Sequence, residues 1–472
     1  MTPERFTRRD VAPAAWRGEV AAALADGWRF AGLWAEAAGG DGPALRAAFH
    51  RHGERLLLAA PAARDTIVDL VPAAGWDERE AHDLHGAAFA GHEPLRALVD
   101  HDAPTPQWTV PVEGRDVFQV AVGPTHAGVI ESGHFRFHVV GERVLHLDLR
   151  LFYKHRGLER AAEGRPVTDA LRHAERACGA DAVANAIAFA HAVEDARGLV
   201  PTPDLARART LLAELERLYN HLNDLSAICA GVGFAPGTMA FAGLKERAMR
   251  LNATLTGHRF LHGSVRVGGS GLAISAPAAS ELRSALAELR AETRRAWREL
   301  QFAGSVQDRF DGVGVLALED ARRLGAVGPA ARAAGLAIDA RTDAPRLAYR
   351  ELVPAVPEQP GGDVAARVEV RGAELPVVFD LLDELLAAPL EPSVAEPGGA
   401  SRRDGLALVE SPRGQTLCAV ALGDGGVVDR LHLRTGSYAN WPVLAHVVPG
   451  NLLPDFPLIN KSFELCYACA DR

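Results

Sequence analysis

Hydrophobic and polar positions divide the chain into a short mixed section, a strand-rich section and a long helical section. In the first 100 residues, the alanine-rich stretch 44–52 predicts a helix, and the apolar runs 55–60 and 66–71 predict strands. These elements indicate a small α/β unit. The segment 101–107 carries two prolines and few apolar residues, so we expect it to be a linker.

The strand-rich section follows this linker. Apolar or alternating runs predict strands over 118–122, 135–140 and 144–149, with a hairpin turn at Gly141-Glu142. From about residue 168 to 301 the apolar positions recur at helical spacing, most regularly in the leucines of 211–225. Further predicted features are a long helix over 281–302, Pro/Gly-rich loops over 353–364 and 391–405, strands over 417–422 and 427–433, and a turn at Gly423–Gly426.

The expected fold class is therefore α+β. A small N-terminal α/β domain, residues 1–105, precedes a large and mainly helical domain, residues 115–472, with peripheral β-strands. Because both ends of this large domain contribute strands to one body, Cys178 is expected to lie within reach of Cys466 and Cys469.

Composition narrows the functional classes. The chain has 472 residues and a net charge of −9, without a basic stripe, so no nucleic-acid partner is expected. It has no apolar run of roughly 18 residues and no apolar signal core near its start. We therefore expect a cytoplasmic protein whose link to the membrane comes through partners. Five cysteines are too few for a disulfide scaffold and fit reduced thiols or a metal site.

The cysteines are the first candidates for chemistry. The sequence ends in Cys466-Tyr-Ala-Cys469-Ala-Asp-Arg, and Cys178 is followed three residues later by Asp181. Thiolates are soft ligands that suit nickel, iron or zinc, and four donors could come from these two segments. Burial of Cys178 as an ordinary apolar residue is the alternative. Cys229 and Cys418 lie in apolar runs and are expected in the core.

Other polar groups are weaker candidates. Pro412 and Gly414 frame a turn that presents Arg413, either over a metal or an anion or simply to solvent, which is the commoner case. His126 and His134 are framed by glycine and proline and could supply a proton, although loop histidines are usually structural. The cluster 152–159 indicates a salt-bridged turn, and the charges of 216–221 indicate a polar helix face or pairs at helical spacing.

Taken together, these motifs resemble a superfamily that joins the large subunit of membrane-bound, group 4 nickel–iron hydrogenases to the quinone-site large subunit of respiratory complex I. The N-terminal part resembles the small peripheral-arm subunit of complex I, fused as in formate hydrogenlyase and hydrogenase-4 large subunits. The segments that carry the resemblance are Trp76–Gly86, Phe89–Arg96, Gly123–His126, Gly133–Arg136, Arg150–Glu159, Glu175–Gly179, Ser411–Gly414, Tyr438–Pro442 and Cys466–Cys469.

The resemblance implies a mechanism and partners. In the hydrogenases four thiolates hold nickel, two of them bridge to iron, and electrons pass to iron–sulfur clusters in a small partner subunit attached to membrane ion-pumping subunits. It implies metal ligation by Cys178, Cys466 and Cys469, and a place for Arg413 over the iron. A 4Fe-4S cluster is expected in the partner, not in this chain. The expected location is the inner face of the cell membrane, beside antiporter-like subunits.

Two departures from the family pattern bear on the metal. The first motif of the hydrogenases is CxxC, whereas this chain has Asp181 at the second position. Hydrogenase precursors also carry a C-terminal extension that is clipped after metal insertion, whereas this sequence stops at Asp471-Arg472 as complex I subunits do. Both departures point to assembly without the usual maturation step, although Cys466 and Cys469 are retained.

Three functions follow. The first is an electron-transfer subunit of a complex I-like oxidoreductase whose nickel–iron site is altered or lost, with a cavity for quinone lined by His126, His134, Cys178 and Arg413. The second is a functional hydrogenase that uses three cysteines and Asp181. The third is a docking scaffold with zinc or a disulfide at the CxxC. NAD is not expected to bind, because no GxGxxG follows a strand.

Overall fold

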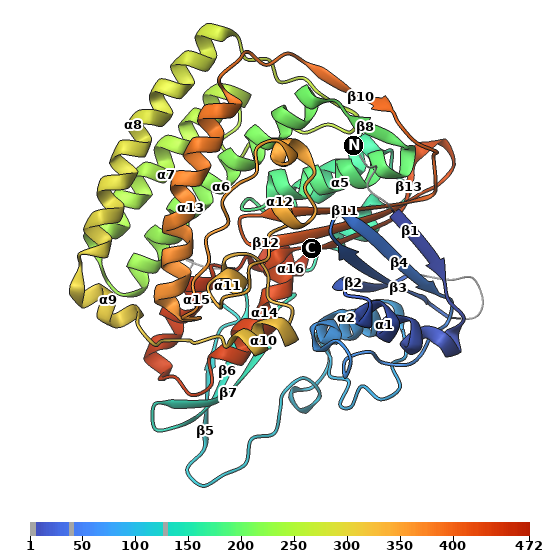
Figure 1. Cartoon of the computed structure of the whole chain (residues 1–472). Helices are drawn as coiled ribbons and strands as arrows, with labels where there is room; N and C mark the ends of the chain where they lie inside the picture. The colour runs from blue at the N-terminus through green and yellow to red at the C-terminus, as the bar shows by residue number, and fades with distance from the viewer. Residues whose placement is uncertain (1–5, 37–41, 126–130) are drawn as a thin grey trace.

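The computed structural model describes residues 6–36, 42–125 and 131–472 (Figure 1). Its N-terminal part is a four-stranded sheet of order β1-β4-β3-β2, in which only β1 and β4 run parallel. Two helices, α1 and α2, lie beside this sheet (Figure 1). The elements are β1 Phe6–Asp10, α1 Trp16–Ala25, β2 Arg29–Glu36, β3 Ala44–Arg51, β4 Glu54–Ala60 and α2 Gly75–His85.

Two predictions for this part are wrong. The alanine-rich stretch 44–52 is strand β3, because Leu45, Ala47 and Phe49 pack into the domain core while Ala48 faces a second apolar layer. Tertiary packing on both faces thus outweighs the helix propensity of alanine. Residues 66–71 form turns and irregular structure instead of a strand. The backbone N–H of Ile67 and the hydroxyl of Thr66 both donate hydrogen bonds to the Glu78 carboxylate, so they are not available to a neighbouring strand.

A three-stranded antiparallel sheet follows the linker. It has the order β5-β6-β7 and a turn at Gly141-Glu142, and it confirms the predicted hairpin. The strands are β5 Phe118–Val122, β6 His134–Val140 and β7 Arg143–Arg150.

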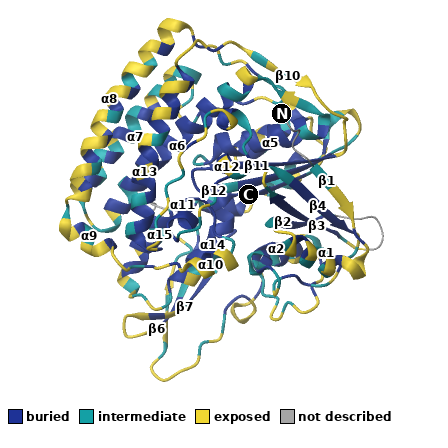
Figure 2. Ribbon diagram, in the orientation of Figure 1, coloured by how far each residue is buried: buried dark blue, intermediate teal, exposed yellow. Residues whose placement is uncertain are grey.

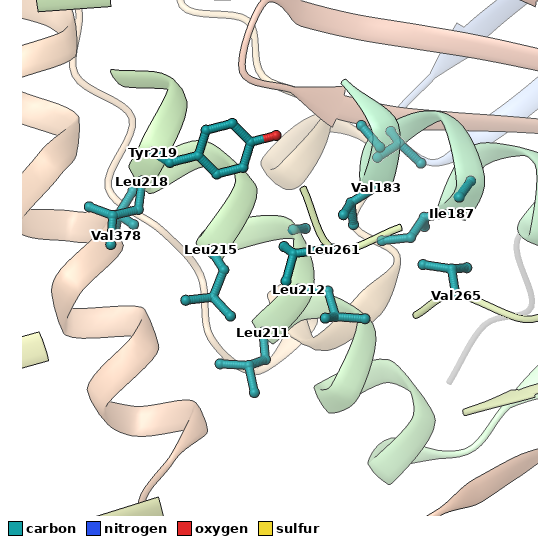
Figure 3. Packing of buried hydrophobic residues seen from close by; sticks show 14 of the residues in the cluster. Val183, Ile187, Leu211, Leu212, Leu215, Leu218, Tyr219, Leu261, Val265 and Val378 are labelled. Atoms are coloured by element: carbon teal, nitrogen blue, oxygen red, sulfur yellow. The ribbon is translucent and has the colours of Figure 1, made fainter. Parts of the chain in front are cut away.

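Five long helices form the body of the large part (Figure 1). Helix α6 lies in the core, and its predicted leucine stripe contacts α13 through Val378 and lies near Val183 and Ile187 of α5 (Figure 3). Helix α5 is buried along almost its whole length, whereas α8 exposes one face (Figure 2). These helices are α5 Ala182–Arg197, α6 Pro203–Gly231, α7 Ala235–Thr256, α8 Ala276–Gln301 and α13 Val364–Leu385.

A second antiparallel sheet, β11-β12-β13, joins this body to the N-terminal part. Alternate residues of β11 face opposite sides, so that Ala407 and Val409 pack with α5 whereas Leu406 and Leu408 pack against the N-terminal sheet. Both faces are therefore buried. The strands are β11 Asp404–Ser411, β12 Gly414–Leu422 and β13 Val428–Arg434. The apolar runs 417–422 and 427–433 predict β12 and β13, whereas β11 was not predicted.

The remaining elements are short. None of the described helices combines the length and apolar character that a membrane crossing requires. The α+β class is confirmed, with the N-terminal sheet ahead of a larger helical part. These elements are α3 Leu158–Ala162, α4 Val167–Glu175, β8 Leu199–Pro201, β9 Gly269–Ser270, α9 Gly304–Phe310, α10 Leu318–Arg323, α11 Gly328–Arg332, α12 Ala340–Asp343, β10 Ser393–Pro397, α14 Gly436–Val447, α15 Phe456–Phe463 and α16 Tyr467–Asp471.

Candidate metal centre

Three cysteine sulfurs meet where α16 approaches the loop between α4 and α5. Cys469 Sγ lies 2.7 Å from Cys178 Sγ, and the sulfurs of Cys178, Cys466 and Cys469 all lie within 4.8 Å of one another. Cys178 and Cys469 are buried, whereas Cys466 is half-buried. The structure therefore brings together the two segments that the sequence predicts to converge. Cys229 and Cys418 are fully buried in the apolar core, as expected.

The three cysteines of the cluster shift one another's pKa values. Contacts with Cys178 and Cys469 hold the pKa of Cys466 well below its usual value, while burial raises the pKa of Cys469. The pKa of Cys178 is also raised, chiefly by its contact with Cys466. One thiolate is thus stabilised by two thiols in this cluster. Binding of a cation would favour the loss of the remaining protons.

The carboxylate of Asp181 lies beside two of these sulfurs. It sits at the N-cap of α5, with Oδ2 3.3 Å from Cys469 Sγ and 3.9 Å from Cys178 Sγ. Oδ1 is buried and has no hydrogen-bond partner among the described residues. Burial raises the pKa of Asp181 to about 6, although the positive charge of Arg413 opposes this shift. A buried carboxylate oxygen of this kind is available to a cation.

One face of α6 holds the loop that carries Cys178 and Asp181. The Tyr219 hydroxyl donates to the carbonyl oxygen of Gly179 at 2.8 Å, and Asn220 Nδ2 donates to that of Ala180 at 2.8 Å. The Glu216 carboxylate accepts from the backbone N–H groups of Val183 and Ala184 in the first turn of α5, at 2.7 and 2.9 Å. The loop geometry is therefore fixed by side chains one helical turn apart.

This role of α6 was missed by the sequence analysis, which expected the charges of 216–221 to form a polar face or local pairs. Glu216, Arg217 and His221 are fully buried, and only Arg217 pairs locally, with Glu214 at 3.3 Å. His221 instead binds Glu374 of α13 at 2.7 Å. The spacing of four residues between Glu216 and Asn220 indicates that both side chains face the same neighbouring segment. Nothing in the sequence identifies this segment as the loop before α5.

Arg413 lies in the turn between β11 and β12 and is buried, so the expectation of a solvent-exposed turn is wrong. Its Nη1 contacts Asp224 Oδ2 at 2.7 Å, and Nη2 donates to Asn220 Oδ1 at 3.2 Å. Burial favours the neutral guanidine, but Asp224 and Asp181 outweigh this effect and keep the pKa of Arg413 above its usual value. A permanent positive charge thus lies behind the carboxylate of Asp181.

Of the two predicted histidines, His134 lies within the described residues. His134 begins β6 and packs edge-on against Trp108, with 5.5 Å between ring centroids. His126 lies outside the described residues, so its predicted role stays a prediction.

A cavity of about 200 Å³ borders Cys466. It has charged walls, with Lys461 3.9 Å from Glu464, and Glu131 accepting a hydrogen bond from the Ala468 backbone at 2.7 Å. This cavity connects one corner of the thiol cluster to the outside. Its lining residues are Glu131, Asn460, Lys461, Glu464, Leu465, Cys466 and Tyr467.

The segment that carries the CxxC is held by its last two residues. The Asp471 carboxylate accepts from the backbone N–H groups of Phe152 and Lys154, at 2.7 and 2.9 Å. Arg472 is buried and pairs with Glu159 at 3.1 Å and with Glu80 of α2. The charged cluster 152–159 is therefore salt-bridged to the CxxC segment through Glu159. The pair between Arg472 and Glu80 attaches the same segment to the N-terminal part.

The donor set limits the metals that fit. Three thiolates and one carboxylate suit a single divalent cation such as zinc. They do not provide the four thiolates of the hydrogenase centre, and a hard carboxylate is a poor substitute for a thiolate between two soft metals.

A helical body that closes a thiol pocket between an early loop and a CxxC segment, behind a small sheet domain, defines a class of large subunits of respiratory and hydrogen-metabolising complexes. The chain belongs to the family described as "Respiratory-chain NADH dehydrogenase, 49 Kd subunit", which matches residues 232–396 and 393–472. Residues 19–111 match the family described as "Respiratory-chain NADH dehydrogenase, 30 Kd subunit". The chain is thus an oxidoreductase subunit with both regions fused, as its motifs predict.

Individual relatives agree with this assignment. Formate hydrogenlyase subunit 5 of Escherichia coli is 32% identical over 86% of this chain and 76% of its own length. Hydrogenase-4 component G of the same organism is 33% identical over 86% and 75%. A chain in the solved structure of the membrane-bound sulfane sulfur reductase, an archaeal respiratory membrane complex, has a TM-score of 0.70 and 27% identity, covering 77% of this chain and 100% of that chain.

Proposed function

We propose that this chain is the large subunit of a membrane-associated, complex I-like oxidoreductase in which the nickel–iron site is altered. The observation that supports the proposal is the place of Asp181, whose Oδ2 lies 3.3 Å from Cys469 Sγ and 3.9 Å from Cys178 Sγ in the group of three cysteines. The family membership supports the oxidoreductase class, and the donor set argues against an unmodified binuclear centre.

Cys178, Cys466, Cys469 and Asp181 are the residues that would hold a cation. A bound divalent ion would supply a fixed positive charge and Lewis acidity to the pocket. Asp224 and Asn220 orient the guanidinium of Arg413, which supplies a positive charge to the side of the pocket near Asp181. The electron route to a quinone-type or proton acceptor does not pass through a nickel–iron pair in this proposal.

The partners follow from the proposed complex. A small iron–sulfur subunit carrying a 4Fe-4S cluster would exchange electrons with the acceptor, and antiporter-like subunits would hold the assembly on the inner face of the cell membrane. The cavity at Cys466 borders the thiol cluster and would admit an external group to it. We also propose residues 1–105 and 115–472 as the two domains.

Metal analysis of the purified full-length chain tests this proposal. An altered site predicts less than stoichiometric nickel and iron, and no hydrogen uptake with an artificial electron acceptor. Nickel and iron together, with hydrogen uptake, would instead identify a functional hydrogenase. Stoichiometric zinc without any redox activity in the assembled complex would identify a docking scaffold.

A further inference from the structure

The three clustered thiols differ in how an external molecule reaches them. Cys466 is half-buried and lines the cavity of about 200 Å³. Cys178 is 7% exposed and Cys469 is fully enclosed. Because thiol–disulfide exchange depends on access to the attacking sulfur, a small reagent that enters the cavity meets Cys466 first.

The two enclosed thiols are the closest pair in the cluster. Cys178 Sγ and Cys469 Sγ lie 2.7 Å apart, and both thiols are free. A disulfide bond is about 2.0 Å long, so a small displacement of either sulfur would allow the bond to form. Every sulfur of the cluster lies within 4.8 Å of the other two, so a disulfide can move from one pair to another.

We propose that this cluster is a thiol–disulfide exchange site for small disulfides, with Cys466 as the attacking thiol and Cys178–Cys469 as the disulfide that finally forms. This inference goes beyond the proposed function and needs only the thiols. It differs from a disulfide within the CxxC segment, because the final bond joins that segment to the loop before α5.

The exchange is balanced in three steps. The Cys466 thiolate attacks the disulfide RSSR, which gives the mixed disulfide Cys466–S–S–R and releases RS⁻. Cys469 then attacks the Cys466 sulfur, which releases the second RS⁻ and joins Cys466 to Cys469. Finally Cys178 attacks the Cys469 sulfur and returns Cys466 as a thiolate. The two protons of Cys178 and Cys469 pass to the two RS⁻ groups, so RSSR is reduced to two RSH.

A quenched time course on the metal-free, full-length chain tests this proposal. Hydroxyethyl disulfide is added, the reaction is stopped by acid and alkylation, and each species is mapped by peptide mass spectrometry. The expected order is a mixed disulfide at Cys466, followed by a Cys178–Cys469 disulfide with Cys466 free again. A first adduct at any other cysteine, a final Cys466–Cys469 disulfide, or no disulfide would overturn the proposal.

Single-residue variants test separately the role of Cys466 as the attacking thiol and the formation of the final Cys178–Cys469 disulfide. Cys466→Ser is expected to slow formation of the Cys178–Cys469 disulfide at least about tenfold, and Cys178→Ser to stop the reaction at Cys466–Cys469. Cys229→Ala is the matched control, because the Cys229 thiol is as fully buried as that of Cys469 but lies outside the cluster. This variant should change the rate less than about twofold. An unchanged rate in Cys466→Ser would refute the entry role. If a variant does not fold, the order of species in the unaltered chain decides.

Discussion

Asn220 Oδ1 accepts a hydrogen bond of 3.2 Å from Arg413 Nη2. The amide nitrogen of the same side chain donates to the carbonyl oxygen of Ala180, in the loop between Cys178 and Asp181. The buried side-chain amide of Asn220 therefore links the loop that carries Cys178 and Asp181 to the guanidinium of Arg413.

Asn220→Ala is expected to weaken divalent-metal binding about tenfold or more, because side chains that orient ligands typically have effects of this size. It would also remove one of the two partners of the Arg413 guanidinium and the side-chain donor to the Ala180 carbonyl, at a cost of roughly 1–3 kcal/mol in unfolding free energy. Zinc affinity, measured by competition with a chromophoric chelator, checks the first effect and thermal unfolding the second.

The control for this variant is Asn223→Ala, one turn along the same helix, where the side chain contacts Lys245 and Glu464 instead of the loop. Equal losses of zinc affinity in the two variants would show that Asn220 acts only through general stability.

Asp181→Cys is expected to complete a set of four thiolates. Soft metals should then bind at least about tenfold more tightly, because thiolate is the preferred ligand of zinc and nickel in such sites. Cobalt titration provides the readout, since each added thiolate strengthens the sulfur-to-metal charge-transfer absorption. Asp181→Asn, which keeps the size but not the charge, should lose affinity. Identical cobalt spectra for Asp181→Cys and the unaltered chain would show that residue 181 is not a ligand.

The stability of the metal-free chain should depend on the protonation of Asp181. Burial raises its pKa from 3.8 to about 6, so the folded state holds its proton more tightly than the unfolded chain does. The resulting stabilisation is fully present below about pH 3.8 and is lost as the pH rises through 6. Between pH 5 and pH 8 this loss is on the order of 1 kcal/mol.

Asp181→Asn resembles the protonated acid and should avoid that loss. The Tm of the variant relative to the unaltered chain is therefore expected to rise between pH 5 and pH 8, with a chelator present throughout. A constant difference in Tm over this range would contradict the assignment of a raised pKa.

Arg472→Ala is expected to destabilise the protein by about 3–5 kcal/mol, because it leaves the buried Glu80 carboxylate without its guanidinium and removes one of the partners of Glu159. Thermal or denaturant unfolding measures this loss. The exposed pair Arg283–Asp383 provides the comparison, and Arg283→Ala should destabilise the protein far less than Arg472→Ala. Similar losses in both variants would mean that the Arg472 pairs are weakly coupled to folding.

The sequence predicted the parts of the fold that rest on periodicity. The leucines of α6 and the apolar runs of β12 and β13 show their pattern directly, and these elements are confirmed. Strand β3 was misassigned because alanine favours a helix locally, and only packing on both of its faces decides for a strand. That information lies in distant segments and has no local signal.

The candidate site shows the same division. The spacing of Cys466, Cys469, Cys178 and Asp181 indicated a shared pocket, and the structure places these groups together. The burial of Arg413 was not predicted, because it depends on Asp224 and Asn220, which lie about 190 residues away. Ion pairs between distant segments leave no periodic pattern in a sequence.

The distance along the chain between the two closest thiols has a consequence for biogenesis. Cys178 and Cys469 are separated by 291 residues, which a ribosome adds in roughly 15–60 s. During that interval the loop around Cys178 exists without its counterpart. Any ion held by both of these thiols must therefore arrive after translation has passed Cys469.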